Sequence, residues 1–335
     1  MIVSIMFINY KIIIFYLLFN IFFLISGSSS FASEDFNAWL IDYKQYALKK
    51  GVSEETLNLA FQDVKFLRQV IKYDRKQPEF FEDTNTYVSK RANLSRLKIS
   101  KKFLKSNKKF LDLIEKEFLV EKEILLALWG IETNFGKHVG KMDIISCLAT
   151  LSFDKRRSEF FSSQLLTLLK LIDQNLVDHS QLYGSWAGAF GNFQFMPSTI
   201  KNYAIDYDKN NKIELKSIND SFASAANYIN KIGWKQGEPC FYKVKLNKKI
   251  KEKYFNTSAR KLSNKLKVSD WEKKGVVKEN GSNFNINLKA ALILPDGKPD
   301  TPTFLVFENY EKILKWNRSL RFGISVCTLS EMIKS

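Results

Sequence analysis

Histidine and cysteine are scarce in this chain. Two histidines, His138 and His179, and three cysteines, Cys147, Cys240 and Cys327, occur among its 335 residues. A Ser-His-Asp triad therefore has few places to form, and the cysteine spacing fits no zinc pattern. In an oxidising compartment, Cys240–Cys327 is the disulfide we would expect, although unpaired buried thiols fit the sequence at least as well.

Charge is nearly absent from the N-terminal segment, where Lys11 is followed by the almost continuously apolar residues 12–25. Small residues come next in GSSSFAS, and Ser30 and Ala32 have the spacing of an A-x-A-like cleavage site. The pattern predicts a signal peptide at residues 1–32, cleaved after Ala32. An uncleaved inner-membrane anchor is the alternative, but the apolar run is short for a spanning helix. No cysteine lies near the cleavage site, so we expect no lipoprotein attachment.

Acidic residues are outnumbered by basic ones, 35 against 52. Cleavage would remove one basic and no acidic residue, which lowers the net charge from +17 to +16. Such a charge favours acidic partners, namely nucleic acid, anionic lipid or an acidic cell-envelope polymer. Lysines are spread along the chain without a long basic block, which is typical of a solvated surface. We expect no nucleic-acid partner, because an exported protein would rarely meet one.

Helical periodicity runs through much of the remaining chain. Residues 35–75 predict helices that stop at Gly51 and start again at Ser53, where two glutamates follow in the first turn. Residues 142–153, MDIISCLATLSF, are apolar enough to be buried, and residues 157–176 have strong helical periodicity.

The composition changes near residue 236. Alternation in CFYKVKLNKKI and over residues 283–294, turn signals after it, and the β-rich TFLVF at 303–307 predict strands. We therefore expect a small β-containing insert over residues 236–307. Beyond it, GISVCTLSEMIK returns to helical periodicity.

One stretch, EKEILLALWGIETNFGKHVG at residues 121–140, places a carboxylate on an apolar helix face. Glu132 lies four residues after Leu128 and three after Trp129, and Gly136 is the expected helix end. If Glu132 is desolvated there, its pKa rises toward neutrality and it becomes a proton donor. The same pattern also fits a frayed helix end with Glu132 turned to water.

Two further segments have the residue types of binding sites. GSWAGAFGNFQFMPST at 184–199 has three glycines that let the backbone pass close to something, but no GK[ST] follows, so it is no phosphate loop. Pro197 should begin a helix after it.

The second segment, DYDKNNKIELKSIND at 206–220, has the alternating Asp, Asp, Asn that opens an EF-hand-like calcium loop. Asn211 replaces the usual glycine but tolerates the left-handed conformation. Ser217 occupies the position of the usual glutamate, so Asp220 would have to close the site. A polar surface turn is the alternative.

Together, GIETNFG, LATLSF…RRSEFF, GSWAGAFGNFQFMPST and DYDKNN…NDSFASAANYI resemble the B-type lytic murein transglycosylases, in order and at matching spacing. YDRKQPEFF upstream and LILPDGKPDTPTFLVFENYEKILKWNRS downstream extend the resemblance over nearly all of the mature chain. It implies a mainly α (α+β) fold with a lysozyme-like catalytic domain. With the segments predicted above, the expected parts are a signal peptide at 1–32, an N-terminal helical region at 33–117, a catalytic core at 118–235, a β-containing insert at 236–307, and a segment at 308–335 that returns to the groove.

The resemblance also implies the chemistry. Such enzymes cleave peptidoglycan glycan strands between N-acetylmuramic acid (MurNAc) and N-acetylglucosamine (GlcNAc) without adding water. Glu132 matches their single catalytic glutamate, which protonates the glycosidic oxygen and then accepts the proton of the C6 hydroxyl, giving a 1,6-anhydro product. No cofactor is required for this chemistry.

The resemblance assigns substrate contacts one residue at a time. The implied substrate-binding residues are Arg156, Arg157, Ser185, Gln194, Tyr228, Trp316 and Asn317. Trp316 stands where the family usually has tyrosine, and Phe322 where tyrosine is common. Both keep an aromatic face, so we expect both to stack on sugar.

The family likeness also favours the calcium loop over the surface turn. Its implied ligands are Asp206, Asp208, Asn210, the backbone oxygen of Lys212, and Asp220, holding a structural Ca²⁺. We expect the protein in the periplasm of a bacterium, soluble or loosely associated with the membrane or with cell-wall enzymes.

Three rival functions remain open from sequence. A hydrolytic muramidase would need a second carboxylate about 5–9.5 Å from Glu132, and Asp154 is the first candidate. A catalytically silent peptidoglycan-binding protein would leave Glu132 unexplained. A calcium-stabilised structural protein would leave the sugar-site motifs unexplained.

Overall fold

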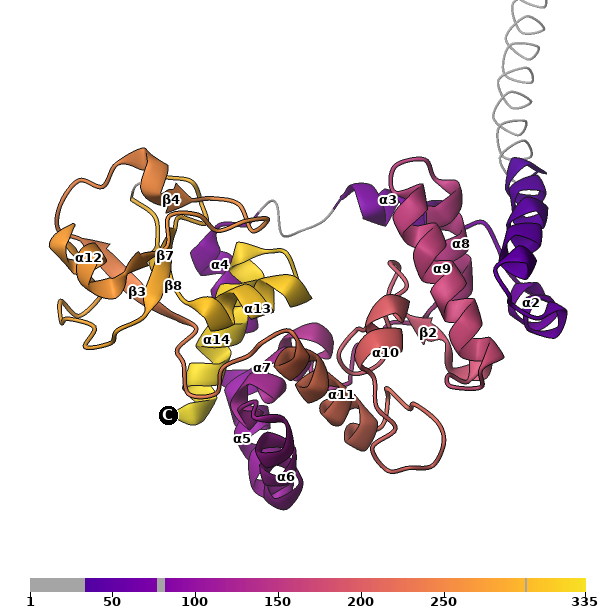
Figure 1. Ribbon diagram of the computed structural model, residues 1–335, viewed down its shortest axis with the longest axis horizontal. Coiled ribbons are helices and arrows are strands. Elements are labelled where there is room, and N and C mark those ends of the chain that lie inside the picture. Colours follow the sequence, from indigo (N-terminus) through magenta and orange to yellow (C-terminus); the bar gives the residue numbers. More distant parts are fainter. Residues whose placement is uncertain (1–33, 77–81, 299) are drawn as a thin grey trace, which may run out of the picture.

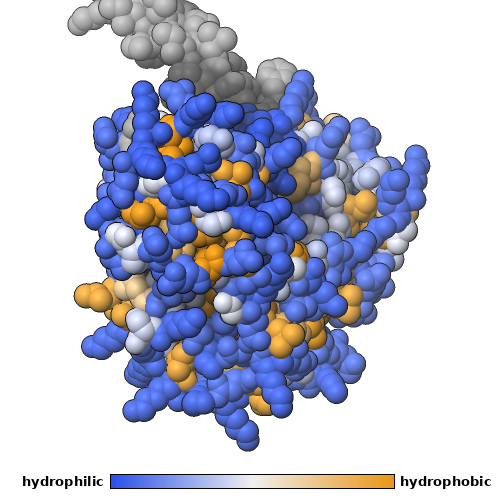
Figure 2. Space-filling model, turned by 60° about the vertical axis from the view of Figure 1, so that its left-hand side comes forward, coloured by the Kyte–Doolittle hydropathy of each residue, from blue (hydrophilic) through white to orange (hydrophobic). Residues whose placement is uncertain are grey.

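The structure is a computed structural model that describes residues 34–76, 82–298 and 300–335 (Figure 1). The predicted signal peptide lies outside these residues. Among the residues that the structure describes, no helix is long and apolar enough to cross a bilayer. Figure 2 shows a mainly hydrophilic face on which hydrophobic residues are scattered in small groups, as the dispersed lysines predict.

The N-terminal half of the chain is helical, beginning with residues 34–49. Ser53 caps the next helix, as predicted, and its side chain accepts a hydrogen bond from the Thr56 amide. The helices that follow are α2 (Glu54–Phe61), α3 (Arg68–Arg75), α4 (Thr84–Arg91), α5 (Leu94–Ser106), α6 (Lys108–Phe118) and α7 (Lys122–Thr133).

The catalytic region predicted from sequence is built around α7 and four later helices. The elements are β1 (Met142–Asp143), α8 (Ile144–Phe153), α9 (Ser158–Asp173), η2 (His179–Gln181), β2 (Tyr183–Gly184), α10 (Pro197–Tyr203) and α11 (Ile218–Lys231). Helix α8 is mostly apolar and buried on all sides, as the run at 142–153 predicts. Pro197 begins α10, where a missing backbone N–H costs nothing.

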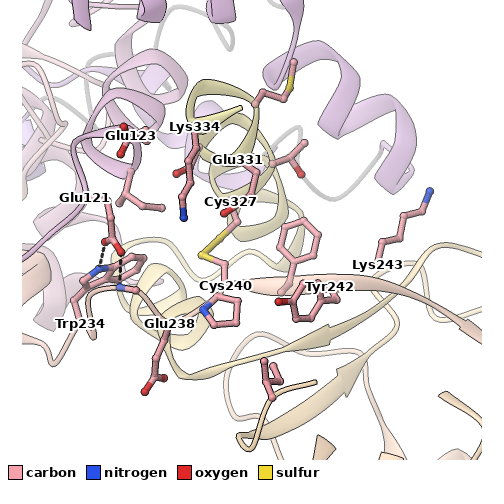
Figure 3. A pocket seen from close by; sticks show the side chains of 18 residues that line it. Glu121, Glu123, Trp234, Glu238, Cys240, Tyr242, Lys243, Cys327, Glu331 and Lys334 are labelled. Atoms are coloured by element: carbon pink, nitrogen blue, oxygen red, sulfur yellow. Dashed lines mark hydrogen bonds between the residues drawn. A yellow bond between two sulfur atoms is a disulfide. The ribbon is translucent and has the colours of Figure 1, made fainter. Parts of the chain in front are cut away.

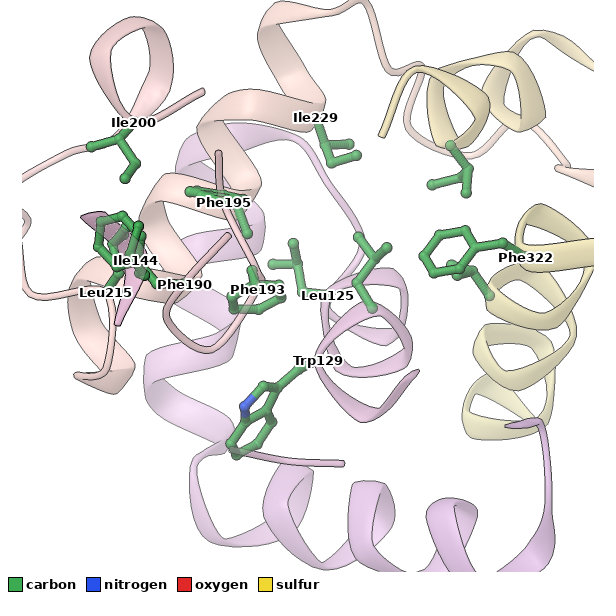
Figure 4. Packing of buried hydrophobic residues seen from close by; sticks show 14 of the residues in the cluster. Leu125, Trp129, Ile144, Phe190, Phe193, Phe195, Ile200, Leu215, Ile229 and Phe322 are labelled. Atoms are coloured by element: carbon green, nitrogen blue, oxygen red, sulfur yellow. The ribbon is translucent and has the colours of Figure 1, made fainter. Parts of the chain in front are cut away.

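One continuous core joins these helices to the C-terminus (Figure 4). Leu125 and Trp129 enter it from α7, and Phe193 and Phe195 enter it from the glycine-rich segment. The last two helices, α13 (Glu308–Trp316) and α14 (Leu320–Lys334), return to this core, and α14 packs along α7.

A six-stranded sheet forms in the predicted insert, in the order β4-β7-β8-β3-β6 with β5 beside β7, and it has its own core around Trp271. Its elements are β3 (Phe241–Leu246), η3 (Glu252–Tyr254), β4 (Phe255–Asn256), β5 (Leu266–Lys267), α12 (Val268–Lys273), β6 (Val276–Lys278), β7 (Lys289–Ile293) and β8 (Thr303–Val306). The strand expected over 283–294 begins only at Lys289, so alternation overestimated its length.

A disulfide between Cys240 and Cys327 joins the residue before β3 to α14. The expected pairing is therefore confirmed, and the sheet is covalently tied to the helical core. Cys147 is buried and unpaired within α8.

Candidate functional site

Glu132 lies in the last turn of helix α7. The helix ends at Thr133, three residues before the predicted stop at Gly136. Asn134 already has a φ of 50°, Phe135 a φ of 61° and Gly136 a φ of 78°, so the left-handed turn starts earlier than glycine alone would indicate. Glu132 therefore occupies the final turn of the helix.

The carboxylate of Glu132 is held by one side chain from the other end of the chain. The indole Nε1 of Trp316 donates a hydrogen bond to Glu132 Oε1 at 2.9 Å. Glu132 is half-buried, and burial raises its pKa to about 7, while the Trp316 hydrogen bond works in the opposite direction. A frayed end with Glu132 turned to water is therefore the wrong alternative.

Trp316 also lines a groove of about 530 Å³. Glu132 is not itself among the lining residues, and it adjoins the groove through its hydrogen bond to Trp316. The lining comes from the start of α9, the glycine-rich segment, α10, α11 and the C-terminal segment, and includes Arg157, Gln194, Tyr228, Lys315, Trp316 and Arg318. No acidic side chain among the described residues lines this groove, so its walls are aromatic, polar and cationic.

Aromatic rings form one wall of the groove. Trp316 lies 5.1 Å from Tyr228 and 5.3 Å from Phe195 between ring centroids, and Tyr228 lies 4.6 Å from Tyr203. The Tyr228 hydroxyl donates to the Lys315 carbonyl at 3.3 Å, and burial raises its pKa to about 12, so it stays neutral. Aromatic faces of this kind suit the apolar faces of sugar rings.

The glycine-rich segment approaches protein backbone rather than an open site. A Cβ on Gly140 would lie 2.0 Å from the Gly184 carbonyl oxygen, so the two segments can approach this closely only because Gly140 has no side chain. Gln194 has a φ of 51°, and its Nε2 donates to the Val139 and Gly191 carbonyls at 3.0 and 3.1 Å.

Ser185 closes a turn of the same segment. Its Oγ accepts a hydrogen bond from the Ala189 amide at 3.1 Å, and it is half-buried outside the groove lining. Gln194 lines the groove, whereas Ser185 does not.

Asn192, which the sequence did not single out, ties this segment to two helices. Its Oδ1 accepts from the Trp129 indole at 3.3 Å, and its carbonyl accepts from Thr133 Oγ1 at 2.8 Å. Its Nδ2 donates to the Lys216 carbonyl and to Ser221 Oγ. Buried Asn192 thus connects the end of α7 with the start of α11. It stands inside the quoted motif GNFQF, which was the available signal.

The two arginines expected at the groove are bound by a buried carboxylate. Arg156 Nε lies 2.9 Å from Asp74 Oδ2, and Arg157 pairs with Asp74 Oδ1. The Asp74 side chain is 1% exposed, so it orients both guanidinium groups. Arg157 lines the groove and Arg156 does not. Asp74 was missed although it lies in YDRKQPEFF.

Phe322 does not lie where the sequence predicted. It is 3% exposed and packs into the core from α14 (Figure 4), so the expected stacking on sugar is wrong. The reason is that α14 begins at Leu320 and turns this face toward the core. Asn317 ends α13 and is half-buried, and the groove is lined by its neighbours rather than by Asn317 itself.

Asp154, the candidate second carboxylate, caps the end of α8 and accepts a hydrogen bond from Arg75 at 2.9 Å. It is absent from the groove lining. An acid paired in this way with Arg75 is poorly placed to serve as a base or nucleophile beside Glu132.

The predicted calcium loop gathers acids from both of its ends. One carboxylate oxygen from each of Asp206, Asp208 and Asp220 lies within 4.8 Å of the others, and Asp220 is fully buried. Three like charges this close favour a cation between them. Asn211 has a φ of 68°, as its tolerance of the left-handed region predicts.

Backbone amides pre-shape the same loop. Asp206 accepts from the Asn211 amide at 2.7 Å, and Asp220 accepts from the amides of Tyr207 and Glu214 at 2.9 and 2.8 Å. Glu214 also accepts a hydrogen bond from Asn210 Nδ2 at 3.1 Å. Glu214 falls at the ninth loop position, where EF-hands place a ligand, and the sequence analysis overlooked it.

A second cavity, of about 540 Å³, lies at the opposite end of α7 beside the disulfide (Figure 3). Glu121 accepts hydrogen bonds there from the Trp234 indole at 2.6 Å and from the Gly237 amide at 2.7 Å. Burial raises the pKa of Glu123 in the same cavity. Its lining includes neither Glu132 nor Trp316, the hydrogen-bond partner of Glu132, so we place the candidate active site at the groove instead.

Comparisons with known proteins agree with this geometry. A family model described as "Transglycosylase SLT domain" matches residues 35–331. Membrane-bound lytic murein transglycosylase B of Escherichia coli K12 is 42% identical over 120 residues, which cover 36% of this chain and 33% of that relative. The chain thus spans about a third of the length of this relative.

Solved structures match a larger share of this chain than the Escherichia coli relative does. SltB3 from Pseudomonas aeruginosa, in complex with NAG-NAM-pentapeptide, superposes with a TM-score of 0.83 at 32% identity, covering 90% of this chain and 80% of that one. Slt35 of Escherichia coli, in complex with calcium, gives a TM-score of 0.75 at 24% identity, covering 88% and 92%. The second likeness shows the fold alone.

Proposed function

Because this chain belongs to the transglycosylase SLT domain family, whose solved members share its lysozyme-like fold, we propose that it is a lytic transglycosylase of peptidoglycan. It would cleave the β-1,4 bond between MurNAc and GlcNAc and leave 1,6-anhydroMurNAc ends. The observation that carries this proposal is the half-buried Glu132, whose pKa of about 7 suits a group that is an acid and then a base. The Pseudomonas relative solved with NAG-NAM-pentapeptide supports a glycan strand with peptide stems as the substrate.

The chemistry needs two proton transfers by one group. Protonated Glu132 donates its proton to the glycosidic oxygen, the bond from C1 to that oxygen breaks, and the GlcNAc 4-hydroxyl leaves. The Glu132 carboxylate then takes the proton of the MurNAc C6 hydroxyl as its oxygen bonds to C1. The acid is regenerated, and no water is consumed.

The groove supplies binding rather than further acid chemistry. Trp316 and Tyr228 present the aromatic wall to sugar, and Arg157 with Lys315 offers positive charge to carboxylates of the peptide stems. Gln194 offers the oxygen of its amide. The assignments of Arg156, Ser185 and Asn317 as substrate-binding residues stay predictions.

A hydrolytic muramidase is the second candidate, and it would need another carboxylate. Among the described residues, none lines the groove, and Asp154 is paired with Arg75. Digestion of purified murein sacculi with the protein, followed by mass spectrometry of the muropeptides, separates the two. We expect anhydro ends, each one water lighter than a reducing end. Reducing ends would identify a hydrolase, and no release would favour a binding protein.

We further propose that the loop at 206–220 holds a structural Ca²⁺. Its ligands would be side-chain oxygens of Asp206, Asp208, Asn210 and Asp220 with the backbone oxygen of Lys212, and Glu214 stands at one further ligand position. The proposal rests on the three clustered carboxylates of this chain and on the burial of Asp220. The ion would fix the loop that leads into α11.

Calcium should therefore raise the melting temperature, because a ligand that binds only the folded state stabilises it. At calcium concentrations about 100-fold above the dissociation constant the gain is roughly 2.7 kcal/mol. A thermal melt with calcium and with chelator measures it. Asp208→Asn should reduce the gain, whereas Asp178→Asn, an exposed cap of η2 outside the loop, should not. A melting temperature that chelation leaves unchanged would contradict the proposed calcium site.

For its location we propose the periplasm, reached through the N-terminal segment at 1–32. The net positive charge suits an acidic cell-envelope polymer. The matching E. coli protein is described as membrane-bound, so anchoring through an uncleaved N-terminus is the alternative. N-terminal sequencing of the exported protein decides between them: Ser33 as the first residue supports cleavage.

A further inference from the structure

The hydrogen bond between Trp316 and Glu132 joins residues 184 positions apart, and the two oxygens of Glu132 have different surroundings. Oε1 accepts from the indole N–H at 2.9 Å. Oε2 has no hydrogen-bond partner among the described residues, and it is not one of their fully enclosed atoms, so a small part of its surface is accessible. The carboxyl group is therefore asymmetric before any substrate arrives.

An indole N–H can donate a hydrogen bond but cannot accept one. The oxygen that faces it must accept in both protonation states of Glu132. When Glu132 is protonated, Oε1 is thus the carbonyl oxygen, and the proton resides on Oε2. A hydroxyl in the same place could accept as well as donate and would not impose this order.

The direction of the N–H is set by packing rather than by Glu132. Trp316 is the last residue of α13, and its ring is held between Tyr228 at 5.1 Å and Phe195 at 5.3 Å, with Phe193 at 6.1 Å. These contacts come from α11 and the glycine-rich segment, which are themselves tied to α7 through Asn192. The donor is therefore pre-organised.

We propose that Trp316 is a positioning residue for Glu132: its indole N–H occupies Oε1 throughout, so that the transferable proton is carried by Oε2, which has no hydrogen-bond partner among the described residues. This role goes beyond the sugar stacking expected from sequence, and it rests on the proposed function for its catalytic meaning. The N–H also stabilises the carboxylate left after proton donation, because hydrogen bonds to charged acceptors are stronger than those to neutral ones.

Other charged or titratable groups stand around the site, and among the described residues none forms an ion pair with Glu132. Arg96 of α5 donates to the Gly130 carbonyl on α7 at 2.9 Å. The groups that line the groove are Arg157, Tyr228, Lys315 and Arg318. The specific partner of Glu132 is therefore the neutral indole.

The chain offers a matched control for this bond. The Trp234 indole donates to Glu121 Oε2 at 2.6 Å at the opposite end of α7 (Figure 3). Trp316→Phe and Trp234→Phe thus each remove one indole–carboxylate hydrogen bond from the same helix. Only the first should change Glu132.

The test is a carbon-13 NMR titration of the Glu132 carboxyl, assigned by its loss in Glu132→Gln, because this readout needs no activity. Trp316→Phe should move the titration midpoint upward by roughly one pH unit, and the alkaline limb of kcat/KM should move by the same amount. Trp234→Phe should leave both in place. Should Trp316→Phe disturb the groove, 3-benzothienylalanine at position 316 removes the N–H and keeps the ring shape.

An unchanged midpoint in both Trp316 replacements would overturn the positioning role. A shifted midpoint in a protein that releases no anhydro-muropeptide would uphold the hydrogen bond's role and sink the proposed function instead. A shift of equal size in Trp234→Phe would also contradict the proposal, because it would trace the effect to general loosening of α7.

Discussion

Glu132→Gln is expected to keep its fold and to lose release of anhydro-muropeptides by roughly 10³-fold or more, since a positioned acid–base group contributes about 10²–10⁴-fold and this one would act twice. The glutamine amide can still accept the Trp316 hydrogen bond but carries no transferable proton. Muropeptide release from sacculi measures the loss. Glu123→Gln is the matched control, because burial raises the pKa of Glu123 on the same helix, outside the groove.

The same variant should be more stable than the wild type at alkaline pH. Below about pH 4.5 the carboxyl is protonated in the folded and the unfolded chain, and burial costs no charge. Between there and its folded pKa of about 7, the unfolded chain ionises first, so wild-type stability falls as pH rises. Above pH 7 the loss is complete, up to about 3 kcal/mol, and glutamine avoids it. Denaturation at pH 5 and pH 8 measures the difference.

Together the two results would distinguish a catalytic acid from a structural one. Lower activity with higher alkaline stability fits a carboxylate kept in an unfavourable setting for chemistry. Lower activity with lower stability at both pH values would indicate that Glu132 mainly supports the fold, and this would contradict the assignment.

Removing the Cys240–Cys327 disulfide should lower the free energy of unfolding by about 2–4 kcal/mol. The bond closes a segment of 87 residues, so its loss frees many conformations of the unfolded chain. It also joins the residue before β3 to α14, which packs on α7. Chemical denaturation of the Cys240→Ala/Cys327→Ala variant measures the loss.

Reductant provides the internal check. Wild-type protein and a Cys147→Ala variant should both lose stability when reduced, because they keep the bond, whereas the double variant should not respond. A wild type that is equally stable with and without reductant would show that the disulfide contributes nothing under those conditions.

Local features of the fold were predictable from sequence because neighbouring residues decide them. Ser53 caps α2, Pro197 begins α10 and the apolar run of α8 is buried, each from chemistry contained within one turn or one helix. The left-handed Asn211 likewise follows from its own side chain. The family motifs further predicted that Glu132 is the catalytic residue and which segments of the chain contribute to the site.

Features that depend on distant contacts were not predictable in this way. Trp316 meets Glu132 across 184 residues, and the two arginines meet Asp74 across about eighty. Phe322 shows the converse, because an aromatic residue in a sugar-site motif turned into the core when α14 packed on α7. A sequence motif therefore predicts which residue type stands at a position, whereas the packing of the helices decides the direction in which its side chain points.

The central claim is that one carboxylate cleaves the glycan strand without water. Digestion of sacculi in water enriched in oxygen-18, with immediate reduction of the products and mass spectrometry, tests it most directly. The account predicts new ends that are 1,6-anhydroMurNAc and carry no label, formed by wild type and lost in Glu132→Gln. New reducing ends that each carry one oxygen-18 would contradict it, because they would show that water, and not the C6 hydroxyl, attacks C1.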